Sequence, residues 1–256
     1  MKLALPVLAL LAACAPALAP PELTIYAAAS LRDALTELTP ALERASGAGV
    51  RFNFGSSGDL ARQIVAADQA DVFFSADEGE LDRVAAAGLV EPGTRRTLLS
   101  NQLVVIEPVD GAPSAFREPF EPVQLLGPDV GLLSLGDPDT VPAGKYARAW
   151  LEQRGLWARV QPHVLPGVDV RAALAAVESG AVRAGIVYRT DAARSSRVRV
   201  VFAVPLAEGP PIAYPLAVLA QRPNAREAVL LAEALSSEAA LAVFTRHGFV
   251  VAARAQ

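Results

Sequence analysis

The chain has 256 residues, of which 52% are hydrophobic and 20% are charged. This apolar content fills one large or two medium hydrophobic cores and excludes a disordered chain. The formal net charge is -4, from 23 basic and 27 acidic residues without a Lys/Arg stripe, which excludes nucleic acid as a partner. The single Cys cannot form an internal disulfide, and together with the two His residues it cannot build a zinc or iron–sulfur site.

Residues 1–19 have the pattern of an export signal: one Lys, no acidic residue and an apolar run that ends in small residues. The run is shorter than the ~18 residues that a membrane span needs. Two processing sites compete. The string LAAC at 11–14 resembles a lipobox, which would make Cys14 a lipid-carrying N-terminus, whereas ALA at 17–19 resembles an ordinary signal-peptidase site. We expect a periplasmic protein, either soluble or lipid-anchored through Cys14.

From residue 23 onward, short apolar runs alternate with amphipathic stretches of helical length. This pattern predicts an α/β fold with a largely parallel sheet. Three consecutive strand–helix units form a first lobe. Their strands are predicted at 23–28, 50–54 and 71–76, and their helices at 30–47, 59–67 and 80–88.

After about residue 101 the alternation of apolar runs and amphipathic stretches becomes less regular, which predicts a second lobe. Strands are predicted at 103–108, 130–138 and 184–188, with helices at 143–155 and 169–180, before the runs 198–205 and 212–220 and a helical region at 225–249. Pro/Gly passages near 91–94 and 208–215 are the best crossover candidates. They predict lobe one over 22–98 plus 216–256 and lobe two over 99–215. Ligands of open α/β sheets bind at the carboxyl ends of strands, so we expect the site in the cleft between the lobes.

Four junctions between a strand and a helix share one design, a turn rich in small and polar residues followed by a helix start. They lie around Ser30, Ser57, Ala143 and Val170. Each helix start offers unpaired backbone N–H donors and the positive end of a helix dipole. Together they predict an anion site that needs no basic side chain.

Each of these residues also has a purely structural interpretation. Ser30 with Asp33 three residues later matches a capping box. Gly144 is explained by tight packing in a first helical turn, and Asp169 is an ordinary N-cap. Tyr188, at the end of a predicted strand, is the kind of residue that packs half-buried with its hydroxyl in water. The recurrence of the design at strand-to-helix edges of both lobes favours the functional interpretation.

The sequence does not match the common catalytic motifs. The string GSSG is not the G-x-S-x-G nucleophile elbow, and the Gly-Lys pair before Tyr146 lacks the Ser/Thr and the leading Gly of a phosphate-binding loop. His163 and His247 lie in separate contexts, a loop and a helix C-terminus, without a nucleophile–base motif. We therefore expect no catalysis, with an enzyme on the same scaffold as the alternative.

Six strings, in order, resemble the periplasmic molybdate-binding proteins that feed ABC transporters. They are AAASL, SSGDLARQI, ADVFFSAD, GDPDTVPAGKYA, DVRAALAAVESG and AGIVY. The match runs from about Leu23 to Phe249, and its most specific piece is GDP-x-x-VPAG-x-Y. The resemblance implies a two-lobed periplasmic-binding-protein fold of type II, with an oxyanion in the interlobe cleft, no cofactor and no bare metal ion. It also implies an inner-membrane permease as partner of a monomeric receptor.

Carried over by motif, the resemblance assigns five binding residues. Ser30 and Ser57 would each give a hydroxyl and a backbone N–H, Ala143 and Val170 would give backbone N–H groups, and Tyr188 would give its hydroxyl. The implied ligand is molybdate, and also tungstate. A receptor for sulfate or thiosulfate, or one selective for tungstate, is the alternative within the same class.

A cage of donors alone has a predictable selectivity. Molybdate, tungstate and sulfate are fully deprotonated dianions near neutral pH, whereas phosphate keeps a proton and needs an acceptor. None of the five positions is acidic, which predicts discrimination against phosphate. Asp33, Asp59 and Asp169 lie close in sequence to these positions and would weaken the prediction if one of them pointed inward.

Overall fold

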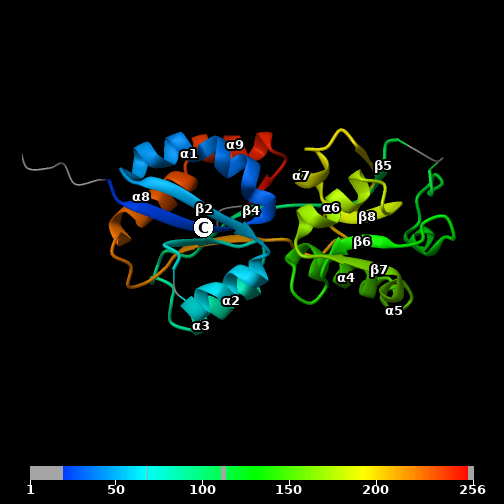
Figure 1. Cartoon of the computed structure of the whole chain (residues 1–256), viewed down its shortest axis with the longest axis horizontal. Coiled ribbons are helices and arrows are strands. Elements are labelled where there is room, and N and C mark those ends of the chain that lie inside the picture. Colours follow the sequence, from blue (N-terminus) through cyan, green and yellow to red (C-terminus); the bar gives the residue numbers. More distant parts are fainter. Residues whose placement is uncertain (1–19, 68, 111–113, 253–256) are drawn as a thin grey trace, which may run out of the picture.

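The computed structural model describes residues 20–67, 69–110 and 114–252. The export signal expected over 1–19, with Cys14, lies outside the described residues. Figure 1 shows two α/β lobes side by side along the longest axis of the molecule, each built around its own β-sheet. The expected two-lobed α/β architecture is therefore confirmed.

The sheet of the first lobe has six strands. They are β1 (Glu22–Ala28), β2 (Gly49–Gly55), β3 (Val72–Phe74), β4 (Arg96–Ser100), β10 (Tyr214–Val218) and β11 (Val250–Val251), in the spatial order β11-β4-β10-β3-β1-β2. β1 is parallel to β2 and β3, but β10 is antiparallel to β3 and β4, and β11 is antiparallel to β4. The expectation of a largely parallel sheet is wrong for the part of this sheet made by β4, β10 and β11, where neighbouring strands are antiparallel. The reason is that β10 returns from the second lobe in the opposite direction.

Helices cover both faces of this sheet, because its strands alternate apolar side chains between two cores. Ile25 and Phe74 face a core shared with α1 (Arg32–Ser46), α8 (Ala225–Leu235) and α9 (Glu238–Arg246). Tyr26 and Phe73, one residue away in each strand, face a core shared with α2 (Ser57–Ala67) and α3 (Glu78–Ala86). α1 ends at Gly47 with φ of 72°, the left-handed C-cap that its position predicts.

The sheet of the second lobe has five strands. They are β5 (Leu103–Pro108), β6 (Leu133–Gly136), β7 (Val164–Gly167), β8 (Ala184–Tyr188) and β9 (Val198–Ala203), in the order β7-β6-β8-β5-β9. β6 is parallel to β7 and β8, whereas β5 is antiparallel to β8 and β9. The helical elements around it are η2 (Pro122–Leu126), α4 (Pro142–Gln153), α5 (Trp157–Val160), η3 (Gln161–His163), α6 (Val170–Glu178) and α7 (Arg189–Ala192).

The chain passes between the two sheets twice. β4 of the first sheet ends at Ser100 and β5 of the second begins at Leu103; β9 of the second ends at Ala203 and β10 of the first begins at Tyr214. The expected boundaries at 98/99 and 215/216 thus fall inside β4 and β10. Both crossings lie within a few residues of the expected positions, and the division into lobes at those boundaries stays a prediction.

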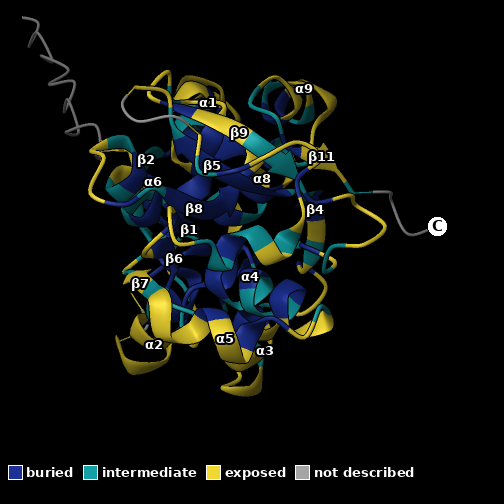
Figure 2. Ribbon diagram, turned by 90° about the vertical axis from the view of Figure 1, so that its right-hand side faces the viewer, coloured by how far each residue is buried: buried dark blue, intermediate teal, exposed yellow. Residues whose placement is uncertain are grey.

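The interior follows the apolar pattern of the sequence. Figure 2 shows β1 and β8 buried between helices whose outer faces are exposed. Trp150 and Trp157 are both buried, and Arg154 stacks over the Trp150 ring at 4.9 Å. Across residues 20–67, 69–110 and 114–252, no single helix is long and apolar enough to cross a membrane; α8 and α9, bent by 58°, meet that requirement only as a pair.

Candidate functional site

The five residues expected to bind a ligand line the same cavity at the junction of the lobes. Ser30 and Ser57 belong to the first lobe, and Ala143, Val170 and Tyr188 to the second. The cavity is small, and its lining comes from both lobes, so it suits one small ligand. The rest of the lining comes from Ala28, Ala29, Gly55, Ser56, Ala76, Val141, Pro142 and Asp169.

Helix N-terminal turns form much of the cavity wall. Ser30 lies in the turn η1 (Ala29–Leu31) that leads into α1, Ser57 opens α2, Ala143 lies in the first turn of α4, and Val170 opens α6. First-turn N–H groups have no intrahelical partner and lie at the positive end of the helix dipole. Donors and positive potential therefore converge from both lobes, without a Lys or Arg among the lining residues.

The loop before α4 explains the string GDPDTVPAG. The Asp137 carboxylate accepts hydrogen bonds from the backbone N–H and the hydroxyl of Thr140, at 3.0 and 2.9 Å, which closes the turn. A Cβ on Gly144 would overlap the backbone carbonyl of Gly136, so the expected packing role of Gly144 is confirmed. This close approach of α4 to the end of β6 holds the Ala143 amide at the cavity.

The capping box expected from Ser30 and Asp33 is wrong. The chain enters α1 through η1, so the N-cap position is Ala28 and no side chain caps the turn. The Ser30 hydroxyl instead lies 3.0 Å from the Tyr214 hydroxyl, while Asp33 accepts a hydrogen bond from Arg171 of the second lobe at 2.6 Å. The Ser30 side chain is therefore engaged at the cavity rather than in starting a helix.

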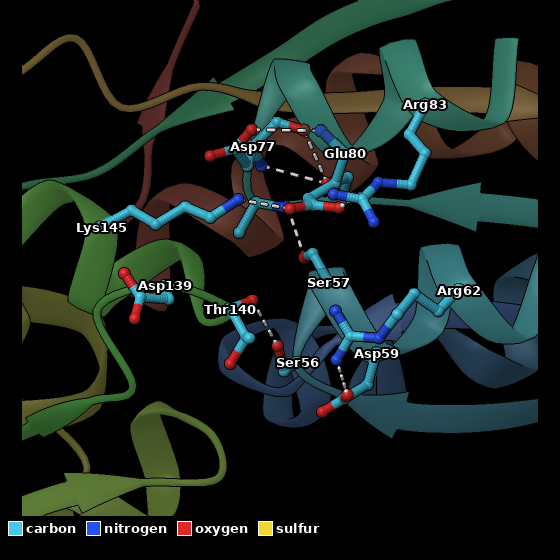
Figure 3. A network of polar contacts seen from close by, with 12 residues as sticks. Ser56, Ser57, Asp59, Arg62, Asp77, Glu80, Arg83, Asp139, Thr140 and Lys145 are labelled. Atoms are coloured by element: carbon cyan, nitrogen blue, oxygen red, sulfur yellow. Dashed lines mark hydrogen bonds and ion pairs between the residues drawn. The ribbon is translucent and has the colours of Figure 1, made fainter. Parts of the chain in front are cut away.

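At the start of α2, two adjacent serines have different roles. Ser57 Oγ accepts a hydrogen bond from the Ala76 N–H at 2.9 Å. Ser56 Oγ donates to the Thr140 carbonyl of the second lobe at 3.1 Å (Figure 3). The sequence offers no signal for this interlobe bond, because its partners lie 84 positions apart.

Tyr188 closes the cavity from β8. Its side chain is 1% exposed, and its hydroxyl makes no hydrogen bond within the described part of the chain. Burial raises the pKa of this phenol well above its usual value, so the group keeps its proton. A buried polar group without a partner is costly, which favours a ligand as its natural acceptor. The expectation of a half-buried Tyr188 with its hydroxyl in water is therefore wrong, because the side chain is fully buried.

The three acidic residues that lie close in sequence to the site each interact with a group of the protein. Asp59 pairs with Arg62 on the surface of α2, and Asp33 pairs with Arg171 and Arg194. Asp169 does line the cavity, but its Oδ1 caps α6 by accepting from the Ala172 N–H at 2.8 Å. The N-cap interpretation of Asp169 is confirmed.

Ion pairs join the lobes on both sides of the cavity. On one side, Lys145 of α4 binds Glu80 of α3, whose side chain is 2% exposed (Figure 3). On the other, Arg171 of α6 binds Asp33 of α1. Burial acts to raise the pKa of Asp33, but the hydrogen bond and charge of Arg171 outweigh it and hold that pKa below its usual value. The Lys145–Glu80 pair thus bridges the two lobes, and the sequence did not indicate this contact.

Asp191 adds a pH-sensitive group behind Arg171. It is 0% exposed, and its Oδ1 lies 2.6 Å from Arg171 Nε. Burial raises the pKa of Asp191 to about 7, although Arg171 acts against this shift. The folded protein therefore binds this proton more tightly than the unfolded chain does. The resulting stability is present at low pH and is lost as the pH rises through the range between the unfolded pKa and about 7.

We expect the Asp191→Asn variant to lose this pH dependence. In the native protein the group should cost about 1.4 kcal/mol per pH unit across that range, equivalent to ~3–6 °C in Tm per pH unit. Measuring Tm of both proteins between about pH 5 and 8 isolates the contribution. Parallel Tm curves for the two proteins would contradict it.

The histidines and potential metal ligands lie elsewhere. His163 is exposed in η3, and His247, the C-cap of α9, lies 2.7 Å from Glu37. Neither lines the cavity, so no serine–histidine pair is present among the lining residues. In the part of the chain that the structure describes, no three His, Cys, Asp or Glu side chains are grouped to hold a metal ion.

Two α/β lobes that enclose a small, donor-lined cavity define the class of two-lobed solute-binding proteins. The chain belongs to the family of bacterial extracellular solute-binding proteins, which matches residues 23–250. The sequence is 36% identical to the molybdate-binding protein ModA of Escherichia coli over 230 residues, 90% of this chain and 89% of that protein. It is 35% identical to ModA of Haemophilus influenzae over 230 residues, 89% of each. The expected resemblance is confirmed.

Solved structures agree on the fold. The periplasmic molybdate-binding protein of Azotobacter vinelandii superimposes with a TM-score of 0.76 at 23% identity, covering 90% of this chain and 100% of that one. The sulfate-binding protein SubI of Mycobacterium tuberculosis gives 0.74 at 18% identity, covering 90% and 86%. The two-lobed arrangement thus serves receptors for different tetrahedral oxyanions.

Proposed function

We propose that this protein is an exported receptor that binds molybdate, and also tungstate, and delivers the oxyanion to the permease of an ABC importer. The observation that carries the proposal is the convergence on one small cavity of helix N-terminal turns from two lobes and of the Tyr188 hydroxyl, which has no hydrogen-bond partner among the described residues. Similarity to two molybdate-binding proteins over most of the chain supports the choice of oxyanion.

In this proposal, Ser30, Ser57, Ala143, Val170 and Tyr188 hold the ligand. Two hydroxyls with their own amides, two further amides and the phenol supply about seven hydrogen bonds, each ~1.5–3 kcal/mol when the acceptor is charged. Desolvation of the dianion and closure of the lobes consume much of this gain. The net affinity therefore depends on both lobes reaching the ligand at once.

Closure couples binding to delivery. Donors on both lobes are satisfied together only when the lobes meet, so the ligand favours the closed form. The Lys145–Glu80 and Arg171–Asp33 pairs join the lobes in that form and add to its stability. The permease would then recognise the closed receptor by its two adjoining lobe surfaces.

The proposal extends to cellular setting and composition. The receptor acts as a monomer in the periplasm, without a cofactor and without catalysis, and molybdenum enters its site only as the oxyanion. Lipid attachment through Cys14 and release as a soluble protein are the two forms of export that the signal allows. Intact mass of the protein purified from membranes and from the periplasmic fraction distinguishes them.

Calorimetric titration of the mature protein with molybdate, tungstate, sulfate and phosphate tests the function. We expect tight binding of molybdate and tungstate, weaker binding of sulfate and the weakest binding of phosphate. Tight phosphate binding with no response to molybdate would overturn the proposal, and a clear preference for sulfate would replace its ligand.

The Tyr188→Phe variant tests the role of the unpartnered hydroxyl. It should weaken molybdate binding about 10- to 100-fold, the equivalent of one hydrogen bond to a charged group. The Tm of the ligand-free protein should not fall, because the hydroxyl has no partner among the described residues. A lower Tm with unchanged affinity would instead assign Tyr188 to packing.

A further inference from the structure

The hydroxyls of Ser30 and Ser57 line the cavity, and the direction of their hydrogen bonds affects which oxyanions the cavity selects. A hydroxyl carries one proton and can either donate or accept, so it suits protonated and deprotonated oxyanions alike. A hydroxyl that is committed to donating favours an oxyanion without a proton over one that carries a proton. The groups behind Ser30 and Ser57, outside the ligand's reach, decide this commitment.

Behind Ser30, the first such group is Asn101, buried between β4 and β5. Its Oδ1 accepts from the Gln102 N–H at 2.9 Å, and because that backbone group can only donate, the orientation of the amide is fixed. The Nδ2 group must therefore face its two remaining partners as a donor. These are the hydroxyls of Thr190 at 2.9 Å and Tyr214 at 3.1 Å.

The hydrogen bond from Asn101 also determines where the Tyr214 hydroxyl donates its proton. It accepts a bond from Asn101, so its own proton is directed at its other neighbour, Ser30 Oγ, at 3.0 Å. Burial raises the pKa of Tyr214 far above its usual value, so the proton is present at every working pH. Ser30 Oγ is thereby made an acceptor toward Tyr214, and its proton is left to point into the cavity.

The Ser57 hydroxyl is also committed to donating into the cavity, in this case by a single backbone contact. Its Oγ accepts from the Ala76 N–H at 2.9 Å, a donor that cannot be reversed. The Ser57 proton is then free for the cavity. Ser30, Ser57, Tyr214 and Asn101 all belong to the first lobe or its border, so both hydroxyls are preset before the lobes close.

We propose that Asn101 and Tyr214 are positioning residues that force the Ser30 hydroxyl to donate, and so make the site select oxyanions that carry no proton. Neither residue lines the cavity. The inference rests on the proposed function, because it assumes that an oxyanion binds there. It adds the source of the selectivity to that function.

The Asn101→Asp variant reverses the relay with almost no change in shape. Its carboxylate accepts from Tyr214, which then accepts from Ser30, and Ser30 Oγ presents a lone pair to the cavity. Sulfate and hydrogen phosphate are matched probes, because both are dianions of similar size at about pH 8, so the added charge affects both equally. Calorimetry, with competition against molybdate for weak ligands, should show the sulfate-to-phosphate affinity ratio falling about tenfold or more.

Two further variants separate the relay from charge. Tyr214→Phe leaves Ser30 free to donate or accept, and Asn101→Asp with Tyr214→Phe keeps the charge but breaks the relay. We expect the ratio to be highest in the native protein, intermediate and equal in both variants that contain Tyr214→Phe, and lowest in Asn101→Asp. Tyr26→Phe, on the opposite face of the same sheet, should keep the native ratio.

The outcomes distinguish the two levels of inference. A native protein that does not bind molybdate would refute the proposed function itself, whereas one that binds molybdate but does not prefer sulfate over hydrogen phosphate would refute only the relay. A native preference that Asn101→Asp leaves unchanged, or that Asn101→Asp and the double variant reduce equally, would refute only the relay. If Asn101→Asp does not fold, an unchanged ratio in Tyr214→Phe refutes the relay and a lowered ratio supports it.

Discussion

Replacing Gly58 by Ala is expected to weaken molybdate binding ~100-fold or more without destabilising the ligand-free protein. Gly58 lies in the first turn of α2, where a Cβ would overlap the Thr140 carbonyl oxygen of the second lobe. That carbonyl cannot move away easily, because Asp137 holds the turn around it. The extra methyl group therefore obstructs the closed form alone. In the open form, Ala is the better helix former by up to about 1 kcal/mol.

Calorimetry with molybdate, paired with Tm of the ligand-free protein, checks this expectation. Gly49→Ala is the matched control, because a Cβ there would meet only ordinary contacts in the same lobe, and its affinity should stay native. Small-angle scattering adds a structural readout, since Gly58→Ala should keep open dimensions at molybdate concentrations that compact the native protein. Native affinity in Gly58→Ala would mean that the lobes do not approach each other at this contact during binding.

The fold illustrates which features a sequence reveals. Periodicity placed the βα units of the first lobe, because buried strands and amphipathic helices leave local patterns, and Gly47 ended α1 where a left-handed residue was needed. The direction of β10 was not predictable in this way. It depends on how the chain returns from the second lobe, and the run around Leu216 is equally apolar in either orientation.

The candidate site divides along the same line. Ser57, Ala143 and Val170 stand at helix starts that local sequence marks, and the structure gathers them with Ser30 and Tyr188 around one cavity. The groups behind and beside them are invisible locally. Asn101 contacts Tyr214 from 113 positions away, and no short-range pattern records such a pairing. Chemistry of a helix start can be predicted, whereas its supporting partners require the tertiary structure.

The same distinction explains the mistaken capping box. Ser30 and Asp33 have the right spacing, but the turn η1 moves the N-cap back to Ala28. Asp33 is then free to reach Arg171, and its carboxylate belongs to the contact between the lobes. A carboxylate that looked like a threat to anion binding is thus neutralised by a cation from the opposite lobe. At the contact between the lobes the charged side chains pair with one another, while the hydroxyl-bearing residues Ser30, Ser57 and Tyr188 line the cavity.

Replacing Lys145 by Met is expected to weaken molybdate binding ~100-fold, the equivalent of about 3 kcal/mol for a buried charge that loses its partner. Glu80 is 2% exposed where the lobes meet in this structure, and among the described residues it keeps only Arg83, at 3.4 Å, when Lys145 is removed. In the open form Glu80 can be solvated, so the cost falls on closure. Arg148→Met removes the same charge one turn along α4 from an exposed pair, and should change affinity far less.

The double variant Lys145→Met with Glu80→Gln decides why the affinity falls. If the loss arises from stranding a buried carboxylate, neutralising that carboxylate should restore most of the binding, because a buried ion pair contributes much less than the penalty for breaking it. If Lys145 instead attracts the dianion from a distance, the double variant should bind as poorly as the single one, and Arg148→Met should share part of the loss. Titrations at low and high salt separate the accounts further, since screening weakens distant attraction but affects a buried pair little. A coupling energy of at least 1 kcal/mol between the two positions would place Lys145 and Glu80 among the groups that set the closing equilibrium.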